Sequence, residues 1–418
     1  MPELLAPAGN FEKLKVAFHY GADAVYAGLD KLSLRANADN FTRDELAQAV
    51  EYTHAIGKKI YIALNIYFMP EHEARIIDAL IFLADINPDG MIISDMGTFY
   101  LAKKYAPKVA VHISTQANCT NQYAAMMYSS IGVNRVVLAR ELGLDAIQTI
   151  RKALPDLELE VFVHGAMCIA YSGRCLLSSY MTAKGLGTQK DDETRSANQG
   201  DCAHSCRWEF FLKEKTRKDD TFDISSDENG TYILSSKDIC MIDHVKDLID
   251  AGVSSFKIEG RMKSILYISS IVRAYRYVID CIQSGNSLDR VDQVYQELDV
   301  VSHREFSTGF FYKKPYEYAN IAGSAEYKRN TRLAGMVLSV GEKAALKIYN
   351  KVASTDKLTL IGKNMKTIKL GQVRFFDKNG NPTEEAKHTE SFFGIFYDTD
   401  GNIVEPEEMD ILRMESNF

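Results

Sequence analysis

Short apolar runs alternate with amphipathic helical stretches from Glu3 to Ile258, and this alternation constrains the fold of the chain more than any other feature. The apolar runs are bounded by Gly, Pro and Asp, which is typical of strands in a parallel sheet buried on both faces. The candidate strands are Glu3–Ala8, Ala24–Ala27, Lys59–Leu64, Gly90–Ser94, Ala110–Ile113, Arg135–Ala139, Leu159–Val163, Tyr232–Ser235 and Ser255–Ile258. Helical patterns lie between them, for example at Phe11–Tyr20, Arg43–Ile56, Glu71–Ala84, Gln122–Ile131 and Leu144–Leu154. This order predicts parallel strands joined by helical crossovers.

A TIM-like (β/α) barrel is the simplest closure of this repeat, so the predicted fold class is α/β. The nine candidate strands exceed the eight places of a standard barrel. One of the last two, Tyr232–Ser235 or Ser255–Ile258, is therefore expected to be an edge strand or part of an insertion. The periodicity does not say which of the two it is.

Polar residues follow several candidate strands at the point where each strand ends. They are Asn65, Asp95, His112 to Gln116, Arg140, Glu141, His164, Glu259 and Arg261. In a β/α barrel the C-terminal strand ends and the loops after them build the active site, so these side chains are expected to converge on one mouth. Taken singly, each is more simply a helix cap or a loop residue. The prediction depends on their joint placement.

Four of the seven cysteines lie in one short segment. They are Cys168, Cys175, Cys202 and Cys206, in the pattern C-x6-C-x26-C-x3-C. Thiolates are soft ligands that suit a tetrahedral zinc or an iron–sulfur cluster, and in a reducing cytosol such a group indicates metal binding rather than disulfides. A cysteine nucleophile with His164 or His112 as its base is the alternative, but four clustered thiols favour ligation. Cys119 and Cys281 are expected to be buried bystanders.

Two domains are predicted. A barrel domain spans residues 1–288 and carries a metal-binding insertion at about 165–230, of which residues 183–230 are too polar to form core. A metal held by the thiols would order that long loop. Residues 289–329 form a connecting segment, and short β-rich runs separated by Gly, Asn and Asp predict a small β-barrel-like domain at 330–418.

The charge of the C-terminal domain is uneven. Residues 328–369 contain ten Lys and Arg and two acidic residues, whereas residues 370–418 contain four and eleven. A clustered positive face is typical of proteins that bind a polyanion such as RNA, even in a chain whose net charge is −7. A solvated lysine face on an ordinary β domain explains the pattern equally well.

Several common classes of protein are not indicated. The start of the chain lacks the apolar stretch of a signal peptide, and no run approaches the roughly 18 apolar residues of a membrane span, so a cytoplasmic protein without membrane association is expected. There is no G-x-x-x-x-G-K-[ST] phosphate loop and no G-x-S-x-G elbow, and His72-Glu73 does not continue into HExxH. Neither a nucleotide hydrolase nor a zincin is predicted.

The cysteine-bearing blocks carry a resemblance to a known family. EVFVHGAMCIAYSGRCLLS resembles the signature of the peptidase U32 family, and NQGDCAHSCRW, YILSSKDIC and FKIEGRMKS resemble its further blocks in the same order. The match spans nearly the whole chain. The length and the C-terminal β domain are most similar to the branch of bacterial tRNA hydroxylation proteins, which take part in 5-hydroxylation of the wobble uridine. The older label of the family is collagenase-like protease.

This resemblance implies a tRNA uridine hydroxylase that uses a 4Fe-4S cluster and depends on prephenate rather than on dioxygen. The partners expected with it are tRNA, a small anionic co-substrate and a paralogous partner protein. Cys168 and Cys175 match the first cysteine pair of the family, and Cys202 and Cys206 match a C-x3-C pair seen in many members. Some relatives take their fourth ligand from a position that resembles Cys240, so five cysteines compete for four places.

Further candidate residues lie in the same blocks. Arg140, Arg174 and Arg261 would supply positive charge for a dicarboxylate or a phosphate, because a guanidinium binds both in a bidentate manner. The candidate catalytic residues His164, Glu259 and Gln116 would position substrate or transfer protons. An internal salt bridge between Glu259 and Arg261 that closes the barrel is an equally good interpretation of those two residues.

Three classes of function therefore remain open. The first is prephenate-dependent tRNA hydroxylation with an iron–sulfur cluster. The second is a U32-type peptidase, a hydrolase for which the sequence offers no recognisable protease constellation. The third is a non-catalytic RNA-binding protein in which zinc, bound by the four thiols, only orders the insertion.

Overall fold

The computed structural model describes residues 1–29, 32–33, 40–168, 170, 175–182, 195–208, 225–227, 230–232, 236–312, 331–388 and 391–415. These residues form two compact units. The barrel unit consists of Met1–Leu14, Asp23–Met262 and Arg304–Glu326. The C-terminal unit consists of Lys15–Ala22, Lys263–His303 and Tyr327–Phe418.

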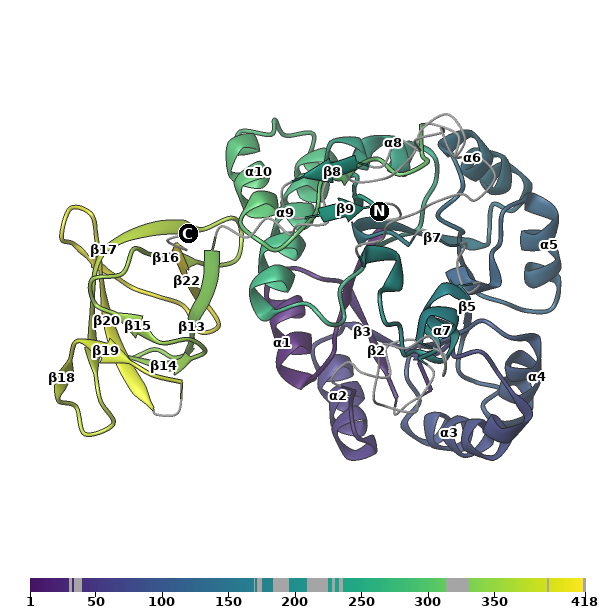
Figure 1. Cartoon of the computed structure of the whole chain (residues 1–418), viewed down its shortest axis with the longest axis horizontal. Helices are drawn as coiled ribbons and strands as arrows, with labels where there is room; N and C mark the ends of the chain where they lie inside the picture. The colour runs from purple at the N-terminus through teal and green to yellow at the C-terminus, as the bar shows by residue number, and fades with distance from the viewer. Residues whose placement is uncertain are drawn as a thin grey trace. The chain divides into compact units, whose positions relative to one another are not determined.

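Eight parallel strands form a closed ring in the barrel unit (Figure 1). They are β1 (Glu3–Pro7), β2 (Ala24–Gly28), β3 (Lys59–Leu64), β4 (Gly90–Ile93), β5 (Val111–Ile113), β6 (Arg135–Val137), β7 (Glu158–Ala166) and β11 (Ser255–Ile258). Neighbours pair in this order, and β11 closes the ring because it pairs with both β1 and β7. The predicted TIM-like barrel is confirmed.

Helices alternate with these strands, and Figure 1 shows α2 to α6 on the outside of the ring. The helices up to the closing strand are α1 (Phe11–His19), α2 (Arg43–Ala55), α3 (Glu73–Ile86), α4 (Met96–Tyr105), α5 (Gln122–Ser130), α6 (Leu144–Ala153), α7 (Leu177–Thr182) and α8 (Val245–Asp250). Side-chain hydrogen bonds cap the N-termini of several of these helices. Thr42 and Glu45 form a capping box at α2, and Asp95 accepts a hydrogen bond from the backbone N–H of Thr98 at α4. Asp95 is thus a helix cap.

The ninth candidate strand is not part of the ring. Tyr232 belongs to β9 (Gly230–Tyr232), which pairs with β8 (Ser225–Asp227) in a separate two-stranded sheet, and residues 233–235 lie outside the described residues. A further strand, β10 (Asp238–Cys240), lies antiparallel to β7 and parallel to β12 (Phe306–Ser307). The closing strand is therefore Ser255–Ile258. The chain between β7 and β11, residues 167–254, is an excursion from the ring.

The interior of the ring contains a buried ionic network. Arg135 lies 2.7 Å from Glu3, 2.7 Å from Glu158 and 3.0 Å from Oε2 of Glu160. Nζ of Lys257 lies 2.8 Å from Oε1 of the same Glu160. Burial would raise the pKa of Glu160, but Lys257 and Arg135 outweigh burial and hold this pKa at about 2. Glu160 is therefore an ionised carboxylate with a cation on each oxygen.

Antiparallel strands form the core of the C-terminal unit, as predicted. They are β13 (Thr331–Ser339), β14 (Ala344–Ile348), β15 (Val352–Ala353), β16 (Leu358–Ile361), β17 (Thr367–Phe376), β18 (Pro382–Thr383), β19 (Glu385–Ala386), β20 (Phe392–Asp398), β21 (Ile403–Val404) and β22 (Ile411–Glu415). Because β17 pairs with both β16 and β20, the strands β17, β16, β22, β13, β14 and β20 close into a small barrel. Val337, Leu360 and Phe396 belong to its apolar core.

Two helices of the C-terminal unit, α9 (Ile265–Ser284) and α10 (Val291–Asp299), are joined to this small barrel by buried charges. Glu297 of α10 lies 2.6 Å from Arg273 of α9 and 2.6 Å from Arg413 of β22. Arg273 also donates hydrogen bonds to the carbonyl oxygens of Gly362 and Lys366. Since both arginines share one buried carboxylate, these contacts connect two helices and a strand of the unit.

The basic and acidic stretches of the C-terminal unit pair with each other. Four lysines of residues 328–369 lie close to carboxylates of residues 370–418, in the pairs Lys351–Glu385 (2.7 Å), Lys357–Glu415 (3.9 Å), Lys363–Glu407 (2.9 Å) and Lys366–Asp410 (3.2 Å). Part of the local excess charge is thereby neutralised within the unit. This pairing favours solvated lysines over a continuous basic face.

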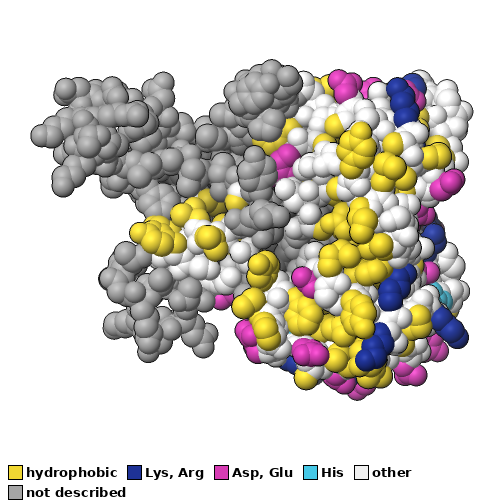
Figure 2. Space-filling view, turned by 90° about the vertical axis from the view of Figure 1, so that its right-hand side faces the viewer, with side chains coloured by type: hydrophobic (Ala, Val, Ile, Leu, Met, Phe, Trp, Pro, Cys, Tyr) yellow, Lys and Arg dark blue, Asp and Glu magenta, His cyan; other side chains and the backbone are white. Residues whose placement is uncertain are grey.

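The outer helices of the barrel unit present apolar side chains to solvent. Figure 2 shows this face, with hydrophobic side chains gathered along its middle. The large exposed ones on α4 and α5 include Tyr100, Tyr123, Met126 and Met127. Among the described helices, none has the length and apolar character needed to cross a membrane.

Candidate active site

A cavity of about 190 Å³ lies at the C-terminal ends of the barrel strands. Residues that follow β3, β5, β6 and β11 line it: Asn65, Gln116, Arg140, Glu259 and Arg261. The short 3-10 helix Thr115–Ala117 presents Gln116, and Nδ2 of Asn65 lies 3.3 Å from Oγ of Ser114. The ring therefore brings together side chains that are far apart in the sequence, at the edge where β/α barrels place their active sites.

Arg140 and Glu259 form an ion pair in the wall of this cavity. Nη2 of Arg140 lies 3.2 Å from Oε2 of Glu259, and Nη1 donates to the carbonyl oxygen of Ala166 at 3.2 Å. The guanidinium also lies 4.0 Å from the centre of the Phe162 ring, within cation–π distance. Glu259, which follows β11, is thus paired with Arg140, which follows β6. An ion pair between Glu259 and Arg261, one of the two interpretations that the sequence left open, is not found among the described residues.

Arg261 is buried beside β2. Only 4% of the residue is exposed, and Nη2 lies 2.7 Å from Oγ of Ser33. Gly28, the last residue of β2, makes this position accessible, because a Cβ built on Gly28 would lie 2.2 Å from Nη1 of Arg261. The glycine is required for close approach of the guanidinium, a role that glycine often has beside a functional group.

The four clustered cysteines line the same cavity. They are Cys168, Cys175, Cys202 and Cys206, the first exposed and the others partly buried. Local hydrogen bonds position the later pair: Ser178 of α7 donates to the carbonyl oxygen of Arg195 at 2.7 Å and accepts from the backbone N–H of Ala203 at 2.9 Å. Segments before and after the gap at 183–194 are thereby held side by side at the mouth of the barrel.

The chemistry of the thiols fits a metal centre, since four soft donors line one cavity. As the side chains stand in the described part of the chain, no three His, Cys, Asp or Glu residues are grouped closely enough to hold a single ion. Cys240 is partly buried at the end of β10, where it pairs with His164, and it does not line the cavity. Cys119 and Cys281 are buried, and burial raises the pKa of the Cys119 thiol to about 11.

Five of the residues predicted at the mouth or in the site are placed elsewhere or are not described: Asp95, which caps α4, Glu141, His164, Arg174 and His112. His164 is fully buried in β7, with its ring 5.4 Å from that of Phe306, and it is not among the residues that line the cavity. Arg174 lies outside the described residues. His112 is buried inside the ring, where burial and the nearby charge of Arg135 lower its pKa to about 3, so it is a neutral imidazole at ordinary pH.

Sequence reasoning missed several residues of the cavity wall. Lys257, Tyr26 and Phe162 line it from inside the ring, and Asn198 lines it from the excursion after β7. Lys257 had a recognisable signal, because a lysine in the middle of the apolar strand SFKI is unusual in a buried parallel sheet. Tyr26 and Phe162 had no such signal, because aromatic residues are common in strands.

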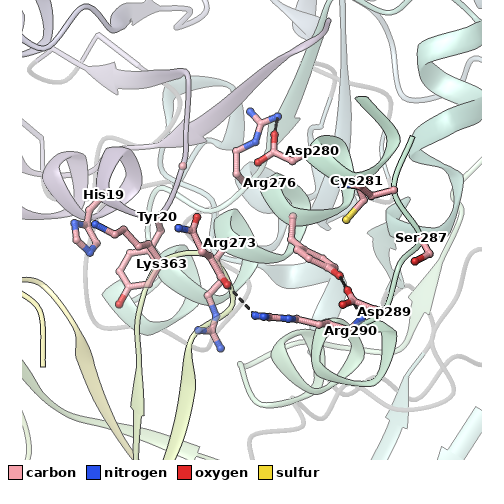
Figure 3. A pocket seen from close by; sticks show the side chains of 14 residues that line it. His19, Tyr20, Arg273, Arg276, Asp280, Cys281, Ser287, Asp289, Arg290 and Lys363 are labelled. Carbon is pink, nitrogen blue, oxygen red and sulfur yellow. Dashed lines mark hydrogen bonds and ion pairs between the residues drawn. The ribbon is translucent and has the colours of Figure 1, made fainter. Parts of the chain in front are cut away.

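A second cavity, of about 470 Å³, lies within the C-terminal unit (Figure 3). In its wall Arg276 pairs with Asp280 at 2.6 Å, and Nη1 of Arg290 donates to the carbonyl oxygen of Asn364 at 3.1 Å. Lys363 also lines this cavity and pairs with Glu407. Most of its charges are thus already paired, and none of the site residues predicted from the sequence and described by the structure lies there.

Comparison with known proteins agrees with this arrangement. Residues 9–320 match the model of peptidase family U32. The chain is 38% identical over 392 residues to a Bacillus subtilis protein named "tRNA hydroxylation protein P1", covering 93% of this chain and 90% of that protein. It is 34% identical over 405 residues to "tRNA hydroxylation protein P" of Escherichia coli, with 86% of each chain covered. It is 38% identical over 374 residues to an "uncharacterized protease" of Methanocaldococcus jannaschii, with 87% of each covered. On this evidence the chain belongs to peptidase family U32.

Proposed function

We propose that this chain is an RNA-modifying enzyme that hydroxylates tRNA. The observation that carries the proposal is the cavity in which four cysteines meet Gln116, Arg140, Glu259 and Arg261 at the mouth of a TIM-like barrel. Relatives that match the chain over most of its length are named tRNA hydroxylation proteins. Although the family is named for peptidases, the site combines soft metal ligands with guanidinium groups, a combination suited to redox chemistry on an anionic substrate.

The finer proposal is prephenate-dependent 5-hydroxylation of the wobble uridine. An anticodon base is unpaired, so it can leave its stack and enter a pocket at a lower cost in free energy than a base within an RNA helix. Arg261 and Arg140 would bind the carboxylates of prephenate, because guanidinium groups pair with carboxylates through two parallel hydrogen bonds. Glu259, held 3.2 Å from Arg140, would accept or return a proton, and the amide of Gln116 would orient the substrate.

Cys168, Cys175, Cys202 and Cys206 would hold a 4Fe-4S cluster, which supplies one-electron chemistry when bound. The position of Cys240 outside the wall of the cavity favours Cys202 and Cys206 as the second pair of ligands. The ion pair between Arg140 and Glu259 keeps a charged group beside the thiols, where charge and hydrogen bonds tune a metal centre.

Mass spectrometry of tRNA nucleosides tests the proposal. We expect 5-hydroxyuridine derivatives to disappear from a strain that lacks this chain, to return with the wild type, and to remain absent with Cys168→Ser. Cys119→Ser is the matched control, because this buried thiol lies outside the cavity and its loss should leave the modification in place. Derivatives that persist in the deletion strain, in the absence of a paralogue that replaces the chain, would refute the assignment.

Analysis of the anaerobically purified protein separates the remaining classes of function. Iron with acid-labile sulfide, lost in the Cys168→Ser variant, supports the cluster. One zinc ion without sulfide would instead favour the non-catalytic, zinc-ordered protein. Peptide hydrolysis that survives removal of the metal and is abolished by Glu259→Gln would favour the peptidase.

A further inference from the structure

Lys257 occupies an unusual position for a lysine. It is the third residue of β11 and is only 4% exposed, yet it lines the cavity at the mouth of the barrel. Lysine is among the residue types least often buried, and burial of its charge is costly unless the charge is paired. The lysine therefore needs a physical reason to be there.

Three groups around Lys257 attract a positive charge. Nζ lies 2.8 Å from Oε1 of Glu160, 4.5 Å from the centre of the Tyr26 ring and 5.5 Å from that of Phe162. Glu160 is fully buried and ionised, and the faces of aromatic rings favour cations. These contacts hold an ammonium group in a fixed place at the inner wall of the cavity.

The hydrogen-bonding capacity of this ammonium is not used up. A protonated lysine has three N–H donors, and among the described residues Glu160 is the acceptor found for Nζ. Two donors therefore remain, and buried donors without acceptors are unfavourable. Since Lys257 lines the cavity, a ligand bound there can supply the acceptors.

The rest of the ionic network does not need Lys257 to provide a counter-ion for Glu160. Arg135 already lies 3.0 Å from Oε2 of Glu160, so the carboxylate would keep one cation if the lysine were replaced. Neither Arg135 nor Glu160 lines the cavity. Lys257 is thus the member of the network that lines the cavity. Glu160 pairs with Lys257, and Arg135 pairs with Glu160.

We propose that Lys257 contacts the substrate directly, with its ammonium group holding an oxygen atom that carries negative charge. This inference rests on the proposed function. The oxygen has two sources there, the carboxylate of the small anionic co-substrate and the carbonyl oxygen of the RNA base. A fixed cation is suited to either one, and the two are distinguished by measuring which ligand depends on Lys257.

The test uses four variants of the full chain: Lys257→Met, Glu160→Gln, the double variant with both changes, and Lys246→Met as the control. Lys246 is exposed, does not line the cavity and, among the described residues, pairs with Asp250 at 2.6 Å, so its loss should change nothing. Affinities for prephenate and for unmodified tRNA are measured separately by calorimetry and fluorescence anisotropy, and formation of 5-hydroxyuridine is followed by mass spectrometry. The double variant removes both charges of the pair, so it keeps the fold if Lys257→Met alone does not.

We expect Lys257→Met to weaken the binding of one of the two ligands by about 10- to 100-fold, which is the effect expected from losing a hydrogen bond to a charged group. Weaker prephenate binding with unchanged tRNA binding identifies the carboxylate, and the reverse identifies the base. The double variant should be equally impaired. Recovery of wild-type affinity and turnover in the double variant would overturn the inference, because Lys257 would then serve only to neutralise Glu160.

Failure of the inference and failure of the proposed function give different results. If the wild type binds both ligands and Lys257→Met binds them equally well, only the role of Lys257 is wrong. If the wild type binds neither ligand and forms no 5-hydroxyuridine, the proposed function is wrong and the inference falls with it.

Discussion

Replacing Gly28 by alanine should destabilise the barrel through a residue that is distant in sequence. The new Cβ would lie 2.2 Å from Nη1 of Arg261 and 2.7 Å from both Oγ of Ser33 and Oδ1 of Asn40. Ordinary contacts between heavy atoms that are not bonded begin near 3.5 Å, so the guanidinium would have to move by more than about 1 Å. Arg261 is 4% exposed and has little room for that movement.

The expected cost follows from the contacts that this movement disturbs. The hydrogen bond from Arg261 to Ser33, now 2.7 Å long, would be lost, and a hydrogen bond to a charged group contributes about 1.5–3 kcal/mol. Overpacking adds about 1–3 kcal/mol. We therefore expect Gly28→Ala to lower the free energy of unfolding by about 2.5–6 kcal/mol. Since Arg261 lines the cavity, enzymatic activity should fall as well.

Urea unfolding followed by far-UV circular dichroism measures this loss. Gly143→Ala is the control, since its Cβ would meet nothing closer than 3.4 Å, and it should cost less than about 1 kcal/mol. In a Gly28→Ala, Arg261→Met double variant the closest contact, with the guanidinium, is gone, so alanine should cost less than it does beside Arg261, although the contacts with Ser33 and Asn40 at 2.7 Å remain. Equal stability of Gly28→Ala and the control would refute the reasoning.

Three further predictions concern buried charged or titratable side chains. Arg135→Met leaves three carboxylates without their shared cation and should lower the free energy of unfolding by about 3–5 kcal/mol, measured by urea unfolding; an unchanged midpoint would contradict this. His112 has a folded-state pKa of about 3, below its ordinary value near 6.5, so between these values the unfolded chain binds a proton that the folded chain does not. Stability should therefore fall by up to about 1.4 kcal/mol per pH unit as the pH drops below about 6.5, and His112→Gln should flatten this slope in urea titrations at pH 7 and pH 5. Arg273→Met removes a cation from the buried Glu297 and should lower the melting temperature followed by circular dichroism, whereas the exposed Lys357→Met should not.

The barrel could be predicted because its signal is repeated. Each apolar run between Gly, Pro or Asp is a weak indication of a strand. Eight such runs that alternate with helical patterns, however, are compatible with few folds other than a closed barrel. That one of the last two runs lies outside the ring was expected, but which one was left open, because a short β-rich sequence such as that around Tyr232 pairs locally in a hairpin just as readily as in a ring. Whether such a run forms a local hairpin or a ring strand depends on which strand it pairs with, and a single sequence does not reveal that partner.

The site could be predicted as a set but not in its internal contacts. Strand ends fix which residues reach the mouth, so Asn65, Arg140 and Glu259 were expected there and lie there. Whether Glu259 meets Arg140 or Arg261 depends on the spacing of strands around the ring, and His164 is buried because β10 pairs with the end of β7. Both outcomes follow from tertiary geometry, on which the local sequence carries no information.

The pairing pattern of the ring also has a consequence for biogenesis. All the clustered thiols come from the excursion between β7 and β11 or from its very start, whereas the eight ring strands pair with one another without it. The ring strands therefore do not depend on the thiol-bearing segment for their pairing partners. If the thiols hold the proposed iron–sulfur cluster, the scaffold would fold before the cluster is inserted, and maturation would be a separate, later event. Cells short of iron would then accumulate a folded form that can be activated when iron returns, without new translation.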